Sequence, residues 1–172
     1  MRYDLFTTPF WHIENEIPQP LVDELYQGAY KFKDKHESVS YSNYRGYQSP
    51  GFNWEDFHPY GKEVVKDIVS KAIEIDFNIS NWWYNINGKE AWNLPHCHPG
   101  SDLALVLYLT ETDDLLHLIN PFSQRRLNET STYVPSTKKG DILIFPSDIQ
   151  HFVMPNQKEE DRISISMNLQ LS

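Results

Sequence analysis

Residues 140–151 read Gly-Asp-Ile-Leu-Ile-Phe-Pro-Ser-Asp-Ile-Gln-His, and this stretch decides the fold. The opening glycine predicts a turn, residues 141–145 predict a buried strand, and Pro146 predicts a second turn. His151 then opens another β-rich run, over 151–154. Short strands that follow one another with a turn between each pair are typical of a sandwich or barrel.

The same succession of strand and turn continues through the C-terminal half of the chain, where glycine and proline residues separate seven β-rich runs. The runs are 81–87, 103–110, 115–119, 131–135, 141–145, 151–154 and 162–170. Upstream, apolar residues recur at helical spacing from Pro20 to Tyr30, and again over about residues 60–75. The sequence therefore predicts an α+β fold, with two supporting helices and then a jelly-roll core of short strands.

We expect one domain over residues 1–172, with helical support over about 18–78 and the core over about 79–172. Residues 36–58 are rich in serine, asparagine, glycine and aromatic residues, and predict a long structured loop. Its aromatic side chains, among them Trp54, either form a lid over a site or cap the core.

Composition narrows the range of partners. The net charge is −9, which argues against a nucleic-acid partner because such proteins present a basic surface. The one cysteine, Cys97, cannot form a disulfide within the chain. No apolar run has the length of a signal peptide or of a membrane-spanning helix, so we expect a cytoplasmic protein without a membrane partner.

Three histidines form a candidate metal site. His96 and His98 stand two residues apart, and on an extended backbone they would share a face about 6.6 Å apart. His151, at the start of another strand, can supply a third ligand, which leaves three coordination positions for a bidentate cosubstrate and oxygen. The alternative is that all three are ordinary polar residues of strands and turns.

The last β-rich run alternates strictly between polar and apolar residues. Its polar residues are Arg162, Ser164, Ser166 and Asn168, and its apolar residues are Ile163, Ile165, Met167 and Leu169. Such a polar row faces water in most sheets, but in a barrel that holds an anionic ligand it can face inward. The guanidinium fork of arginine matches a carboxylate, and a serine hydroxyl can add a hydrogen bond to the same oxygens.

With these residues in place, residues 40–169 resemble the iron- and 2-oxoglutarate-dependent oxygenases, and more narrowly a family of such proteins from bacteria and phages. The features that carry the resemblance are Ser42-Asn43, Gly46-Tyr47-Gln48-Ser49, Trp83 through Asn87-Gly88, His96-x-His98-Pro99, Val106-x-Tyr108-Leu109, Phe145-Pro146-Ser147 and Arg162-Ile-Ser164-Ile-Ser166. The resemblance implies a double-stranded β-helix and an Fe(II)- and 2-oxoglutarate-dependent dioxygenase. Such an enzyme uses O2 to hydroxylate a substrate, here of unknown identity, and releases succinate and CO2.

The resemblance also implies roles for individual residues. His96, His98 and His151 would bind iron, and they are the expected catalytic centre. Arg162 would hold the distal carboxylate of 2-oxoglutarate with help from Ser164 and Tyr108. Asn85 and Asn87 share a strand face and would contact the cosubstrate; the alternative is that they lie on a solvated face.

The chain departs from the wider superfamily at the second iron ligand. That superfamily places a carboxylate two residues after the first histidine, where this chain has His98. Asp102 is the alternative ligand, provided that the turn at Pro99-Gly100 folds back toward His96. Tyr47 also stands where the family pattern leads us to expect tryptophan.

Two other interpretations stay open from the sequence. In a cupin, the segments around His96 and His151 would supply four metal ligands for a reaction without 2-oxoglutarate, and a residue such as Arg162 would not be needed. A jelly roll can also lose its metal and act as a binding or structural module, because fold does not determine function.

Overall fold

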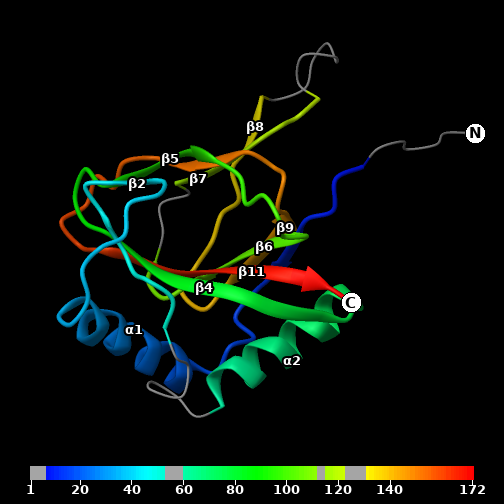
Figure 1. Cartoon of the computed structure of the whole chain (residues 1–172), viewed down its shortest axis with the longest axis horizontal. Helices are drawn as coiled ribbons and strands as arrows, with labels where there is room; N and C mark the ends of the chain where they lie inside the picture. Colours follow the sequence, from blue (N-terminus) through cyan, green and yellow to red (C-terminus); the bar gives the residue numbers. More distant parts are fainter. Residues whose placement is uncertain (1–6, 53–59, 112–114, 123–130) are drawn as a thin grey trace, which may run out of the picture.

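The computed structural model describes residues 7–52, 60–111, 115–122 and 131–172. Two antiparallel sheets face each other, and two helices cover the outer side of the larger sheet (Figure 1). The six-stranded sheet has the order β1 (Trp11–Ile13), β9 (Ile142–Pro146), β6 (Leu103–Tyr108), β11 (Arg162–Leu171), β4 (Phe77–Asn87), β3 (Tyr47–Gln48). The five-stranded sheet has the order β2 (Asn43–Tyr44), β5 (Trp92–His96), β10 (His151–Val153), β7 (Leu116–Ile119), β8 (Thr132–Tyr133). The predicted α+β class with a jelly-roll core is confirmed.

Both predicted helices are present, α1 over Gln19–Lys33 and α2 over Gly61–Ile73. Pro20 occupies the first turn of α1, where its missing N–H costs nothing, and basic residues in the last turn suit the negative end of the helix dipole. α2 ends at Glu74, which adopts the left-handed conformation with a φ of 56°. Within the described residues, no helix is long and apolar enough to cross a membrane.

The larger sheet has two different faces. On its outer face, residues such as Leu105, Ile144 and Ile165 pack with the buried sides of both helices into one apolar core. On its inner face, Val106 and Phe145 pack against the five-stranded sheet in a smaller second core.

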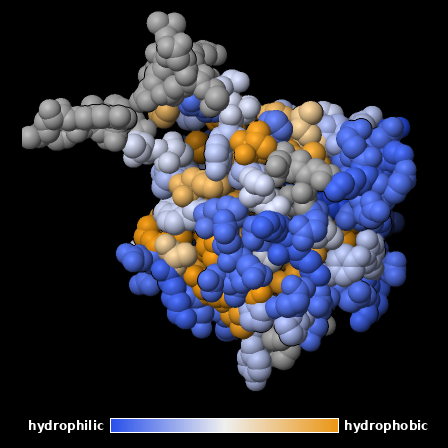
Figure 2. All heavy atoms as spheres, turned by 180° about the vertical axis from the view of Figure 1, so that it is seen from behind, coloured by the Kyte–Doolittle hydropathy of each residue, from blue (hydrophilic) through white to orange (hydrophobic). Residues whose placement is uncertain are grey.

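On the side of the molecule opposite to that in Figure 1, hydrophilic residues cover much of the surface and hydrophobic residues show between them (Figure 2).

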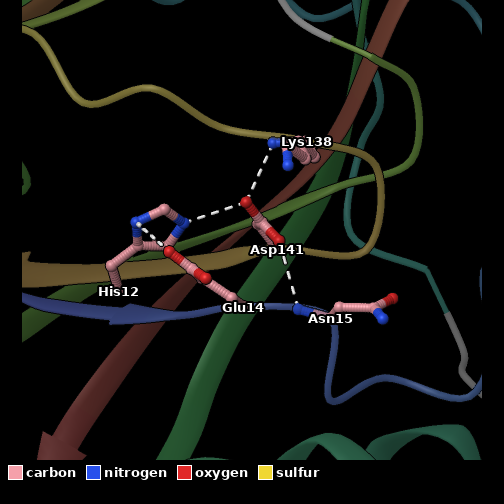
Figure 3. A network of polar contacts seen from close by, with 5 residues as sticks. All are labelled: His12, Glu14, Asn15, Lys138 and Asp141. Atoms are coloured by element: carbon pink, nitrogen blue, oxygen red, sulfur yellow. Dashed lines mark hydrogen bonds and ion pairs between the residues drawn. The ribbon is translucent and has the colours of Figure 1, made fainter.

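The buried side chain of Asp141 links the edge strand β1 to the rest of the sheet by hydrogen bonds (Figure 3). Asp141 precedes β9 and is 3% exposed. Its Oδ1 accepts a hydrogen bond from the N–H of Asn15 (3.1 Å), and its Oδ2 accepts one from the N–H of Lys138 (2.8 Å). The same Oδ2 lies 2.9 Å from Nε2 of His12 on β1. The single polar residue in the run 141–145 therefore closes the turn at Gly140 and holds β1 in place.

The sequence did not predict β5, which carries His96. β5 pairs with β10 irregularly: His96 lies opposite His151, but Asn93 lies opposite Val153. β5 therefore has one extra residue between these pairs, a bulge at Leu94-Pro95, where proline has no N–H to donate. The bulge breaks the alternation of the strand, so that Asn93 and His96 both face the space between the sheets.

The described part of the loop over residues 36–58 is tied to both sheets, because β3 pairs with β4 and β2 pairs with β5. Tyr47 and Phe52 are buried in the core beneath the helices, as the capping interpretation expects. Tyr41, in contrast, is 78% exposed. Residues 53–59, with Trp54, lie outside the described residues.

Candidate metal centre

His96, His98 and His151 come together between the sheets, where β5 ends and β10 begins. His96 ends β5 and lies directly opposite His151, which begins β10, while His98 follows in the next turn. The ring centroids of His96 and His151 are 4.3 Å apart, and those of His98 and His151 are 5.0 Å apart. One ring nitrogen from each histidine lies within 4.8 Å of those of the other two, so small ring rotations would bring all three to one ion.

Hydrogen bonds place the proton on the same ring nitrogen, Nδ1, in all three histidines. Nδ1 of His96 donates to the carbonyl oxygen of Leu94 (2.7 Å), and Nδ1 of His151 donates to that of Ile149 (2.9 Å). Nδ1 of His98 lies 2.7 Å from Oδ1 of Asn168 on β11. Because each Nδ1 carries its proton to an acceptor, each Nε2 is left with a lone pair, as a metal ligand requires.

Burial keeps the imidazoles in the neutral form. Burial, with a smaller contribution from the neighbouring imidazoles, lowers the pKa of His151 to about 3 and that of His98 to about 4. Burial also lowers the pKa of His96. Neutral imidazole is the form that binds a metal, so at neutral pH no proton has to leave before an ion enters.

Asp102, the alternative ligand, lies away from this cluster. Its Oδ2 accepts hydrogen bonds from Nε2 of Gln170 (2.6 Å) and from the N–H of Leu171 (2.9 Å), both at the end of β11. Its backbone N–H donates to the carbonyl oxygen of Leu169. The turn at Pro99-Gly100 therefore leads Asp102 to the C-terminal end of β11 rather than back to His96.

Arg162, the first residue of β11, is only 5% exposed. Its guanidinium carbon lies 5.6 Å from the centre of the Tyr108 ring, and that tyrosine is 1% exposed. Within the described part of the chain, Nε of Arg162 has no hydrogen-bond partner although it is buried. A buried guanidinium with a free N–H is costly unless an anion satisfies it, so its surroundings suit a carboxylate ligand.

The polar row of β11 faces inward. Ser164 lies between Asn85 of β4 and Tyr108 of β6 at one level of the sheet, and Nδ2 of Asn85 donates to the hydroxyl of Ser166 (2.9 Å). One cavity between the sheets joins this row to the histidines. It is lined by Ser42, Trp83, Asn85, Asn93, His96, His98, Val106, Leu116, His151, Val153, Arg162, Ser164 and Ser166.

Asn87 is placed differently from Asn85. It is fully buried but does not line the cavity. Its Nδ2 donates to Oδ1 of Asn93 (2.8 Å), and Nδ2 of Asn93 donates to the hydroxyl of Ser42 (3.1 Å). These three linked side chains connect the two sheets beside the cavity. Asn87 therefore contacts a residue of the cavity wall, Asn93, and does not itself line the cavity.

Sequence reasoning missed several residues of this cavity. Asn93 was hidden because a bulge, not regular alternation, turns it inward. Val106, Leu116 and Val153 looked like ordinary core residues, since apolar lining and apolar packing have the same pattern. Asn168 was predicted in the polar row, but not as the partner of His98.

Comparison with known protein families gives a match over about half of the chain. Residues 81–168 match the model of a family described as "Putative 2OG-Fe(II) oxygenase", and this stretch contains the three histidines and Arg162. No sequence among curated proteins matches the chain.

Solved structures that share the fold include two whose descriptions name 2-oxoglutarate, also called alpha ketoglutarate. The non-heme alpha ketoglutarate dependent epimerase SnoN from nogalamycin biosynthesis has a TM-score of 0.76 at 12% identity, covering 94% of this chain and 77% of that one. HygX from Streptomyces hygroscopicus, solved with nickel and 2-oxoglutarate bound, has a TM-score of 0.69 at 10% identity, covering 95% and 83%. A Pseudomonas putida prolyl-4-hydroxylase has a TM-score of 0.65 at 14% identity, covering 95% and 93%. At these identities the likeness establishes the fold alone.

Proposed function

Because the chain belongs to the 2OG-Fe(II) oxygenase family, and is thus an iron- and 2-oxoglutarate-dependent oxidoreductase, we propose that it hydroxylates a substrate and releases succinate and CO2. When bound, iron and 2-oxoglutarate supply the oxidising chemistry together with O2. The contribution of the chain is to hold both in one partly apolar cavity, to orient them, and to limit the access of water.

We propose that His96, His98 and His151 hold the iron through their Nε2 atoms. The observation that carries this proposal is the bonding of all three Nδ1 atoms to acceptors, which leaves three Nε2 lone pairs for one ion. Three ligands leave positions open for a bidentate cosubstrate and for oxygen. With three neutral imidazoles and no carboxylate ligand, the bound ion would keep its full positive charge.

Arg162 and its neighbours are proposed to bind 2-oxoglutarate. The unpartnered Nε of Arg162 would donate to the distal carboxylate. The hydroxyl of Ser164, the next side chain on the same face of β11, would donate to it as well. Tyr108 would support the guanidinium from the neighbouring strand, and Asn85 faces the same cavity. Asn87 would act indirectly, by holding Asn93 in the cavity wall.

Charge and composition support the remaining parts of the proposal. With a net charge of −9 and one cysteine, the chain suits a cytoplasmic enzyme that acts on a substrate other than nucleic acid or membrane lipid. We propose that residues 1–172 act as one domain, in which the helices over the outer face support the sheet that carries Arg162.

The test is an anaerobic titration of the metal-free protein, first with ferrous iron and then with 2-oxoglutarate, followed by visible absorbance. A charge-transfer band that requires both additions is expected, and it should be absent in His151→Ala and in Arg162→Ala. Arg45→Ala is the matched control, because Arg45 is an exposed arginine paired with Glu90. Iron binding without any effect of 2-oxoglutarate would instead favour a cupin-type reaction, and absence of iron binding would leave a non-catalytic module.

A further inference from the structure

The three histidines differ in how their rings are held. His96 and His151 each donate from Nδ1 to the backbone carbonyl two residues earlier, so the adjoining backbone orients each ring. His98 has no such bond. Its Nδ1 acceptor is the side-chain oxygen of Asn168, a residue 70 positions away on the other sheet.

His98 is also held mainly by residues that are distant from it in the sequence. It lies beyond the end of β5, in the turn that follows, where its backbone N–H donates to the carbonyl oxygen of Ser147 (2.8 Å). The indole of Trp83 lies beside its ring, with 5.5 Å between centroids and a tilt of 48°. These contacts limit where the ring can lie, but among the residues that the structure describes it is the bond to Asn168 that selects which nitrogen carries the proton.

Asn168 is well placed for this task. It lies on β11 between Asn81 of β4 and Ala104 of β6, so strands on both sides hold its backbone. The pairing of β11 with β4 shifts register directly after Asn168, where Ser80 is the extra residue and donates from its hydroxyl to the carbonyl oxygen of Asn168. Bulges of this kind reorient a neighbouring side chain.

We propose that Asn168 is a positioning residue for the metal centre: its carboxamide oxygen fixes the tautomer and the ring orientation of His98, and thereby makes His98 a competent third ligand. This inference rests on the proposal that the three histidines hold iron. Partners of ligating histidines typically change metal affinity by roughly 10- to 100-fold when they are lost, because the free ring samples the wrong tautomer and orientation.

The test compares three substitutions of Asn168 in the full chain by anaerobic calorimetric titration of the metal-free protein with ferrous iron. Asn168→Ala and Asn168→Leu both remove the acceptor, and the leucine keeps most of the volume. Both are expected to weaken iron binding roughly 10- to 100-fold. Asn168→Asp keeps an acceptor at the same place, and its affinity should stay within threefold of the parent or exceed it.

Asn81→Ala is the matched control, because Asn81 is an exposed asparagine directly across the strand pair from Asn168. Its iron affinity should equal that of the parent. Thermal unfolding of each metal-free variant separates a ligand effect from a folding effect: the difference between the Asp and Leu variants should appear in iron affinity and not in Tm.

Two results would overturn the inference: iron affinity in both the Ala and Leu variants within threefold of the parent, or an Asp variant as weak as the Leu variant. Failure of the underlying proposal gives a different pattern. If His151→Ala binds iron as tightly as the parent, the centre itself is wrongly placed; if His151→Ala loses iron while Asn168→Leu retains it, only the role of Asn168 is wrong.

Discussion

The two faces of β11 differ completely in chemistry although they share one backbone. Ile163, Ile165, Met167 and Leu169 point toward the helices, and each is 0% exposed within an apolar core. On the other face, Arg162, Ser164 and Ser166 are also buried but line the cavity that contains the histidines. Both faces are therefore largely buried, and it is the kind of side chain that separates the stabilising face from the functional one.

The difference teaches how stability and binding are divided in this sheet. Burying apolar surface stabilises the fold, whereas burying a guanidinium or a hydroxyl costs free energy until a ligand satisfies it. We therefore expect substitutions on the helix side to change the free energy of unfolding, and substitutions on the cavity side to change ligand affinity.

The largest effect is expected on the helix side. Ile165→Ala should lower the free energy of unfolding of the metal-free protein by about 2–5 kcal/mol, because it removes a fully buried side chain and leaves a cavity. Urea denaturation followed by circular dichroism measures this change. Leu171→Ala, on the exposed end of the same strand, is the control and should cost no more than about 0.5 kcal/mol. A loss of free energy of unfolding in Ile165→Ala as small as that in Leu171→Ala would contradict the idea that the helix side of β11 stabilises the fold.

Arg162 should show the opposite behaviour. Arg162→Met should weaken 2-oxoglutarate binding to the iron-loaded protein by about 2–3 kcal/mol, because a charge-assisted hydrogen bond to a carboxylate is lost. The same change should leave the free energy of unfolding of the metal-free protein unchanged or raise it, since an apolar side chain replaces a buried charge. Calorimetric titration and urea denaturation test the two halves separately. A destabilised variant with normal affinity would show that Arg162 is structural.

Asp141 provides a third case, because it is a buried acidic residue that lies outside the cavity. Asp141→Ala removes the acceptor for Asn15 and Lys138 and should lower the free energy of unfolding by about 1–3 kcal/mol. Affinity for 2-oxoglutarate should not change. Asp23→Ala is the control, because Asp23 pairs with Lys139 at the surface, where such pairs contribute little to stability. Loss of cosubstrate affinity in Asp141→Ala would extend the functional region to the start of β9.

Ser164 should give the smallest effect. Ser164→Ala removes one neutral donor from the cavity and should weaken 2-oxoglutarate binding by about 0.5–1.5 kcal/mol. The free energy of unfolding should change by less than about 1 kcal/mol, since the hydroxyl contributes little to packing. A titration of the charge-transfer band with 2-oxoglutarate measures the affinity, and an unchanged value would exclude Ser164 from the carboxylate site.

Much of this architecture could be predicted from the sequence, because it depends on periodicity. The alternation in β11 and the helical spacing in α1 and α2 are local patterns, and all three elements are found where they were predicted. Alternation shows that the two faces of a strand differ, but it does not show what covers each face. The inward direction of Arg162 therefore required the position of the second sheet.

The remaining parts depend on how the chain turns. Whether Asp102 or His98 approaches His96 depends on the turn at Pro99-Gly100, where Gly100 adopts a φ of 87° that residue types alone do not specify. β5 was missed because proline and asparagine are poor strand formers, and its pairing with β10 is stabilised by neighbours that are distant in sequence.

The bulge in β5 has a consequence for how this segment can vary over evolution. Leu94 and Pro95 are exposed, so their side chains contribute little and can be exchanged. Their number has a defined effect, because deletion of one residue between Asn93 and His96 would leave the two positions two residues apart, and regular alternation would then keep both side chains on the cavity side without a bulge. Natural variants of this enzyme should therefore tolerate substitutions in the segment, and those that lack one of its two residues should keep Asn93 and His96 on the cavity side in a regular strand.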